Sequence, residues 1–154
     1  MLCAVSAVFL AASGCGPSEL SVGRARVKVG EYTAAVLAVL PATARTTSTL
    51  TDQNACGHPD PGAAQNYEVY AAYDLSGVAP SEVERVFDAV RERLATEGFA
   101  VTGRTAQRLE LTNSSNGFTA SVDTRGVGPQ VHGADTLSLV VLSSCARPDS
   151  TPGP

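Results

Sequence analysis

The sequence predicts an α+β fold in which two helices pack on one face of a mainly antiparallel sheet of four to five strands, a two-layer sandwich. Three observations lead to this expectation. Two segments repeat apolar residues at helical spacing, several short segments alternate apolar and polar residues, and most of the alternating segments follow the helical ones. A chain of 154 residues is long enough for one domain with a real core.

The first helical pattern runs from Val29 to Leu40 and stops before Pro41. Just before it, residues 24–29 alternate basic and apolar side chains, so this short segment could be helix or strand. Residues 42–66 are rich in Thr, Ser, Pro, Gly and Asp, which indicates a long loop. Cys56 lies near the middle of this loop, and we expect it to hold the loop in place.

The second helical pattern is the clearest in the chain. We expect Ser81 to cap its N-terminus, with Glu84 completing a capping box, and Gly98 to end it. One face of this helix would be buried, and the residues of that face are Val83, Val86, Phe87, Val90 and Leu94.

Alternation predicts the strands, which are residues 67–75, 99–103, 108–112, 118–123 and 136–144. The pair Asn116-Gly117 would supply the positive φ angles of a tight hairpin turn. The last strand is apolar on both faces, which is typical of a central strand. The sheet face away from the helices would then be only partly polar, with Tyr70, Ala72, Arg108, Glu110, Thr119, Ser121, Val140 and Leu142 on it.

The first 14 residues are apolar or small and uncharged, and they end in Leu10-Ala11-Ala12-Ser13-Gly14 before Cys15. This segment resembles the signal peptide and lipobox of bacterial lipoproteins. The resemblance implies that residues 1–14 are removed, that Cys15 carries a lipid, and that the protein is held on the extracytoplasmic face of the cell membrane. The alternatives are a buried helix and a secreted form with unmodified Cys15, whereas a membrane span would need about 20 apolar residues.

In this organisation, residues 15–21 are the lipidated N-terminus and tether, 22–148 form the α+β domain, and 149–154 are a disordered tail. Cys3 leaves with the signal peptide and Cys15 is modified, so Cys56 and Cys145 remain and are expected to form a disulfide in an oxidising compartment. A Cys56 nucleophile with His58 as its base is the weaker alternative, since sequence neighbours rarely meet as a catalytic pair.

Composition excludes some functions. The formal net charge is −4 and no basic patch stands out, so nucleic acid is not an expected partner. His58, Asp60 and His132 could bind a metal, but they do not form a recognisable ligand motif, and we expect no metal and no cofactor.

The whole chain resembles the small lipoproteins of actinobacteria, in which a lipobox precedes one α+β domain with two spaced cysteines. Lys28 is the single lysine among 11 basic residues and alanine is abundant, which is typical of a GC-rich genome. The resemblance implies a location but no activity.

We therefore expect a non-enzymatic binding or accessory module of the cell envelope. It would bind an envelope protein or a small ligand through the sheet residues Tyr70, Val140 and Leu142, or through the loops that contain His58 and His132. The two alternatives are a structural surface protein and a hydrolase-type enzyme with a site around His132, assembled from dispersed residues such as Asp123 and Tyr70.

Overall fold

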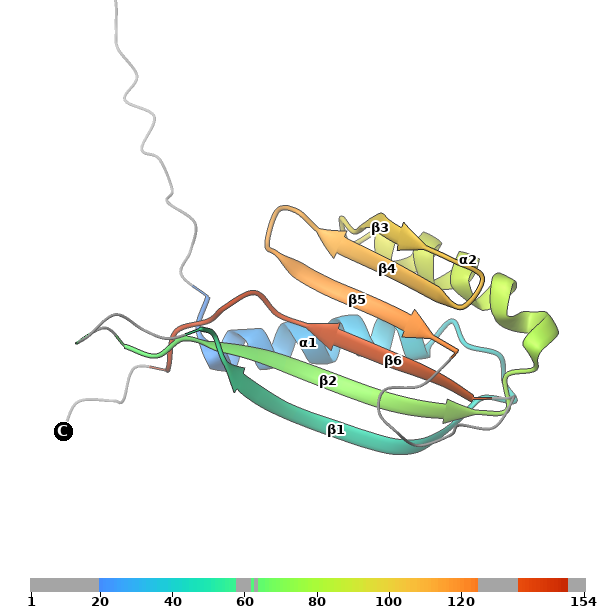
Figure 1. The fold of residues 1–154 in the computed structure, drawn as a ribbon, viewed down its shortest axis with the longest axis horizontal. Helices are drawn as coiled ribbons and strands as arrows, with labels where there is room; N and C mark the ends of the chain where they lie inside the picture. Colours follow the sequence, from blue (N-terminus) through green and yellow to red (C-terminus); the bar gives the residue numbers. More distant parts are fainter. Residues whose placement is uncertain (1–19, 58–61, 63, 125–135, 150–154) are drawn as a thin grey trace, which may run out of the picture.

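The computed structural model describes residues 20–57, 62, 64–124 and 136–149, and its elements form two layers (Figure 1). One layer is a six-stranded sheet with the order β1-β2-β6-β5-β4-β3, in which all neighbouring strands are antiparallel. The α+β prediction is confirmed, with six strands in place of four to five. In chain order the elements are α1 (Val22–Leu37), β1 (Arg45–Ala55), β2 (Tyr67–Ser76), a 3₁₀ turn (Pro80–Glu82), α2 (Val83–Ala95), β3 (Ala100–Arg104), β4 (Arg108–Asn113), β5 (Phe118–Asp123) and β6 (Thr136–Leu142).

The additional strand is β1, which lies within the segment that the sequence predicts to be a loop. It pairs with β2 along its whole length, with one irregularity between Thr46 and Ser48. The loop prediction is wrong here because β1 is exposed on both faces apart from the partly buried Gln53, so its sequence shows no apolar alternation. Its threonines favour an extended backbone, and the hydrogen bonds to β2 stabilise that conformation further.

Helix α1 begins at Val22, seven residues before the predicted start at Val29, and it ends at Leu37. The ambiguous segment 24–29 is therefore helical. Of its apolar residues, Ala25 and Val29 are buried, whereas Val27 is 61% exposed together with the basic residues of the segment.

Helix α2 follows the 3₁₀ turn and buries the predicted apolar face. The predicted capping box does not form: Glu82 occupies the N-cap position of α2 and makes no side-chain capping hydrogen bond. Glu84 instead pairs with Arg104 of β3, its carboxylate 2.5 Å from the guanidinium. The chain leaves the helix through Gly98, whose φ of 88° is in the region that glycine adopts without strain.

The hydrophobic core fills the space between the helices and one face of the sheet. Tyr32 of α1 makes edge-to-face contacts with Phe99 and Phe118, at centroid distances of 4.9 and 5.5 Å. Its hydroxyl accepts a hydrogen bond from the side chain of Asn116 in the β4–β5 turn. In that turn Gly117 has a positive φ of 75° but Asn116 does not, which corrects the predicted turn geometry.

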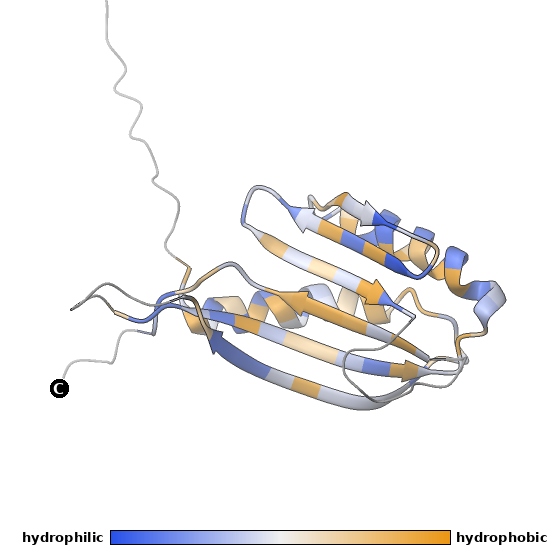
Figure 2. Cartoon of the chain, in the orientation of Figure 1, coloured by the Kyte–Doolittle hydropathy of each residue, from blue (hydrophilic) through white to orange (hydrophobic). Residues whose placement is uncertain are grey.

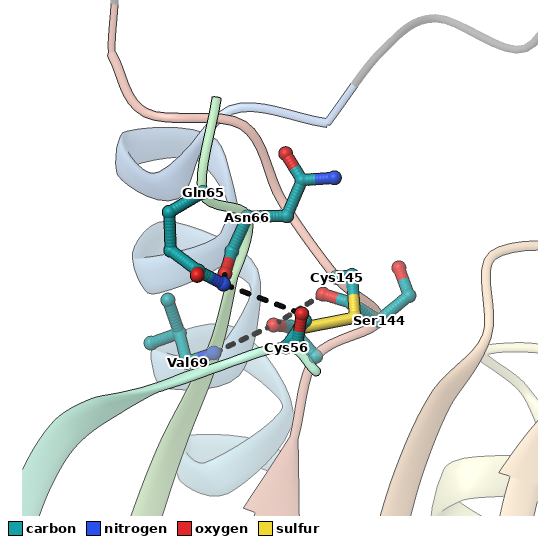
Figure 3. Close-up of a disulfide and its surroundings, with 7 residues drawn as sticks. Cys56, Gln65, Asn66, Val69, Ser144 and Cys145 are labelled. Atoms are coloured by element: carbon teal, nitrogen blue, oxygen red, sulfur yellow. Dashed lines mark hydrogen bonds between the residues drawn. A yellow bond between two sulfur atoms is a disulfide. The ribbon is translucent and has the colours of Figure 1, made fainter. Parts of the chain in front are cut away.

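Cys56 and Cys145 form a disulfide, as predicted, with their Cα atoms 6.1 Å apart (Figure 3). Cys56 directly follows β1, so the bridge joins the end of an edge strand, and not the middle of a loop, to the segment after the central strand β6. The chain beyond Cys145 stays in place because Ala146 and Tyr67 exchange two backbone hydrogen bonds.

Candidate functional site

The sheet face opposite the helices, which we call the open face, is the main candidate surface. Strand register places the predicted residues of this face in lateral rows, since directly paired residues point to the same side. One row is Leu50, Ala72, Val140, Ser121 and Glu110, and the next is Asp52, Tyr70, Leu142, Thr119 and Thr112. Figure 2 shows that β6 in the middle of the sheet is mostly hydrophobic, whereas β1 at its edge is mostly hydrophilic.

Apolar residues gather on the part of the open face formed by β1, β2 and β6. Leu50 is 51% exposed, and the other members are partly buried. Their side chains form a continuous surface across three neighbouring strands. We call this surface the apolar strip; its residues are Leu50, Tyr70, Ala72, Val140 and Leu142.

A shallow depression of about 290 Å³ lies on the apolar strip. Leu50, Tyr70, Ala72 and Val140 line it, together with polar groups that include the Asp74 carboxylate. Small-molecule sites usually enclose most of their ligand within deeper walls. The shape of this surface therefore suits a macromolecular partner better than a small molecule.

Charge on the open face is unbalanced. Register places two basic residues on it, Arg45 and Arg108. Five acidic residues share the face, namely Asp52, Glu68, Asp74, Glu110 and Asp123. The apolar strip thus has an acidic surround.

Hydrogen bonds and ion pairs hold some of the acidic side chains around the apolar strip in position. The Ser138 hydroxyl donates a hydrogen bond to Asp74 at 2.9 Å. Arg108 contacts the carboxylates of Glu110 at 2.7 Å and Asp123 at 3.9 Å, and Asp123 is only 8% exposed. Arg108 and Glu110 also line a second shallow depression, of about 260 Å³, beside Leu142. The polar side chains around the apolar strip are thus positioned by contacts with one another.

A third depression, of about 350 Å³, lies at the start of α1 and is lined by Arg26, Gln53 and Asp149 among others. The first turn of α1 contains no acidic residue, and Asp149 supplies the negative charge there by accepting a hydrogen bond from Gly23 N–H at 3.0 Å. This backbone hydrogen bond, with smaller contributions from Ser21 and Arg26, holds the pKa of Asp149 below its ordinary value. Its role is structural, since it fastens the C-terminal segment to α1.

The structure brings the predicted surface residues Tyr70, Val140 and Leu142 together on adjoining strands. Cys15, His58 and His132 lie outside the described residues. Leu50 and Asp52, which extend the surface onto β1, could not be recognised from the sequence because β1 shows no alternation.

The dispersed residues of the enzyme alternative are separated on the open face. Tyr70 is level with Leu142 of β6 and Asp123 with Ser138, so they lie at least about 13 Å apart along the strand direction. Within the part of the chain that the structure describes, no three His, Cys, Asp or Glu residues are grouped to bind a metal, and no helix is long and apolar enough to cross a membrane. Comparisons with protein families, curated proteins and solved structures find no match to this chain.

Proposed function

We propose that this protein is a membrane-anchored lipoprotein of the cell envelope and acts as a non-enzymatic module that binds an envelope protein through its open face. The observation that carries the binding proposal is the apolar strip, in which Leu50 is exposed and the other four residues are partly exposed. Contiguous exposed apolar surface with a polar surround is typical of a protein interaction site.

The charges around the apolar strip indicate what kind of protein surface would bind there. Because acidic residues outnumber basic ones around the strip, a complementary surface would have an apolar centre and lysines or arginines at its rim. The rim charges would mainly raise the association rate and exclude acidic partners, while burial of Tyr70 and Leu142 would supply most of the affinity.

The anchoring proposal is supported by the resemblance of residues 10–15 to a lipobox and by the short distance from Cys15 to the domain. Only residues 16–19 separate Cys15 from Leu20, the first described residue, and five steps along the chain span at most about 18 Å. The end of the domain where α1 begins would therefore stay close to the membrane.

Site-specific photo-cross-linking in intact cells tests the binding proposal. A photoreactive residue at Val140 should capture one defined envelope protein, and Tyr70→Lys should abolish the capture without lowering the melting temperature. The matched control is a photoreactive residue at Val27, which is 61% exposed on α1, away from the open face. Capture of the same proteins from both positions, or of none from Val140, would reject the proposal.

Fractionation of cells that express the full chain tests the anchor separately. The wild-type protein should sediment with membranes, and its mature N-terminus should carry acyl mass on Cys15. Cys15→Ala should move the protein out of the membrane fraction. An unmodified Cys15 in the mature protein would contradict the anchor and leave the binding proposal standing.

A further inference from the structure

The outer edge of β1 is a second exposed feature of the sheet, separate from the open face of the proposed function. All residues of β1 except Gln53 are exposed, and no described strand pairs with its outer edge. An edge strand of 11 residues without proline or lysine presents a row of backbone donors and acceptors to which another strand can bind.

The hydrogen bonds of the neighbouring segments identify which groups of β1 point outward. The N–H of Cys56 donates to the carbonyl of Asn66 at 2.9 Å, so Cys56 points toward β2. Backbone direction alternates along a strand, and therefore Asn54, Asp52 and Leu50 also point toward β2. The N–H and C=O groups of Thr49, Thr51 and Gln53 therefore point away from the sheet. The Gln53 N–H already donates to the Asp52 carboxylate at 2.8 Å, so the edge offered to a second strand is centred on Thr49 and Thr51.

We propose that β1 pairs antiparallel with β1 of a second copy of this chain, about a two-fold axis at Leu50. In this register the outward N–H and C=O groups of Thr49 form hydrogen bonds with those of Thr51 of the second copy. Leu50 faces Leu50 of the second copy, and Ser48 faces Asp52 of the second copy, where its hydroxyl can donate to the carboxylate.

Neighbouring registers are poorer. An axis at Thr51 sets Leu50 against the Asp52 carboxylate, an axis at Asp52 brings two carboxylates together, and an axis at Thr49 sets Leu50 against the Ser48 hydroxyl. The register centred on Leu50 is the one that places apolar against apolar and opposes no like charges. β1 is thus self-complementary.

The pairing also continues the apolar strip. Leu50 is the outermost member of its row, next to Ala72 and Val140, so the strips of the two copies would meet at the axis. The two open faces would form one surface. Because the contact is only one strand wide, it belongs to the small class of interfaces, and we expect the dimer to dissociate on dilution.

Cysteine cross-linking of the purified full chain tests the register. Leu50 and its copy would form a non-hydrogen-bonded pair with Cα atoms about 4.5 Å apart, which a disulfide can bridge. Leu50→Cys should therefore give a covalent dimer under mild oxidation. Asp52→Cys is the matched control, since its two copies would lie about 13 Å apart. The wild-type chain has every other cysteine of the Leu50→Cys chain and therefore gives the background.

A proline tests whether the contact is a backbone ladder. Thr51→Pro removes an outward N–H and leaves the hydrogen bonds to β2 in place, whereas Thr51→Val keeps the N–H. In the Leu50→Cys chain, Thr51→Pro should lower the cross-linking yield about tenfold and Thr51→Val should not. Circular dichroism melts of the same variants should show that the fold is kept.

Three results would overturn the proposal: a Leu50→Cys dimer no more abundant than the wild-type background, an equal yield from Asp52→Cys, or a yield unaffected by Thr51→Pro. The assay uses one purified protein, so its failure is independent of whether an envelope partner binds the open face.

Discussion

The two edge strands of the sheet differ in how their outer sides are protected. β3 has five residues, a register shift between Val101 and Gly103, and a charged end at Arg104 that pairs with Glu84 and Asp88 of α2. β1 has 11 residues, is exposed on both faces and has its irregularity at one end. A short, bulged and charged edge discourages pairing, whereas a long regular edge invites it.

The two edge strands of the sheet, β1 and β3, are therefore stabilised by different interactions. β3 is joined to α2 by the ion pairs of Arg104, while β1 is held by β2 on one side and by the disulfide at Cys56. Arg26 of α1 reaches β1 with one hydrogen bond to Gln53 at 3.0 Å. Among the residues that the structure describes, no strand pairs with the outer side of β1.

Removing the disulfide should have the largest effect and should act most on the β1 edge. Cys56→Ser with Cys145→Ser opens a loop between residues 89 positions apart, which costs about 4–5 kcal/mol of unfolding free energy from loop-closure entropy. Urea denaturation measures the loss, and hydrogen exchange should quicken more in β1 than in β3. Equal acceleration in both strands would show that the bridge does not hold β1 specifically.

Two leucine-to-alanine substitutions compare how tightly the two edges of the sheet are packed. Leu109 of β4 is fully buried beside β3, so Leu109→Ala should lower the unfolding free energy by about 2–5 kcal/mol. Leu50→Ala on β1 should change it by less than about 0.5 kcal/mol. Chemical denaturation measures the unfolding free energy of both variants. Comparable decreases in the two would mean that Leu50 of β1 is packed against other residues.

A smaller effect is expected from Arg104→Gln, which removes both ion pairs between β3 and α2. Hydrogen exchange in β3 should become faster while global stability changes little, because the pairs are solvent-exposed. Arg93→Gln is the matched control, since it breaks a pair with Glu97 and leaves β3 untouched. Unchanged exchange in β3 would show that its length and bulge alone protect it.

The smallest effect concerns Asp149, beside the β1 end of the domain, and depends on pH. Its pKa is lower in the folded protein than its ordinary value of 3.8, chiefly through the Gly23 N–H. The charged form therefore stabilises the fold fully above pH 3.8, and this contribution disappears as the pH falls through the folded pKa. Melting curves should show wild type above Asp149→Asn at pH 6 and the two converging in acid. A constant difference would contradict the assignment.

Much of the fold follows from local patterns. α2 and the strands β2, β4, β5 and β6 were predictable because one face of each is buried, and burial imposes a period on the apolar residues. Tyr70 followed from the same alternation, and Val140 and Leu142 followed from the position of the last strand, whose sequence is apolar on both faces. The capping box failed because Ser81 lies within a 3₁₀ turn and α2 starts only after Glu82, while Glu84 pairs with Arg104 from a distant strand.

The sequence by itself determined the α+β class, the apolar faces of α2 and of strands β2, β4, β5 and β6, and the pairing of Cys56 with Cys145. Only the tertiary structure decided that residues 45–55 are a strand and that Leu50 joins Tyr70, Val140 and Leu142 on one surface. The physical reason is that β1 buries almost nothing: its conformation comes from hydrogen bonds to β2 and a covalent bond at its end, and neither leaves a periodic signal in the sequence.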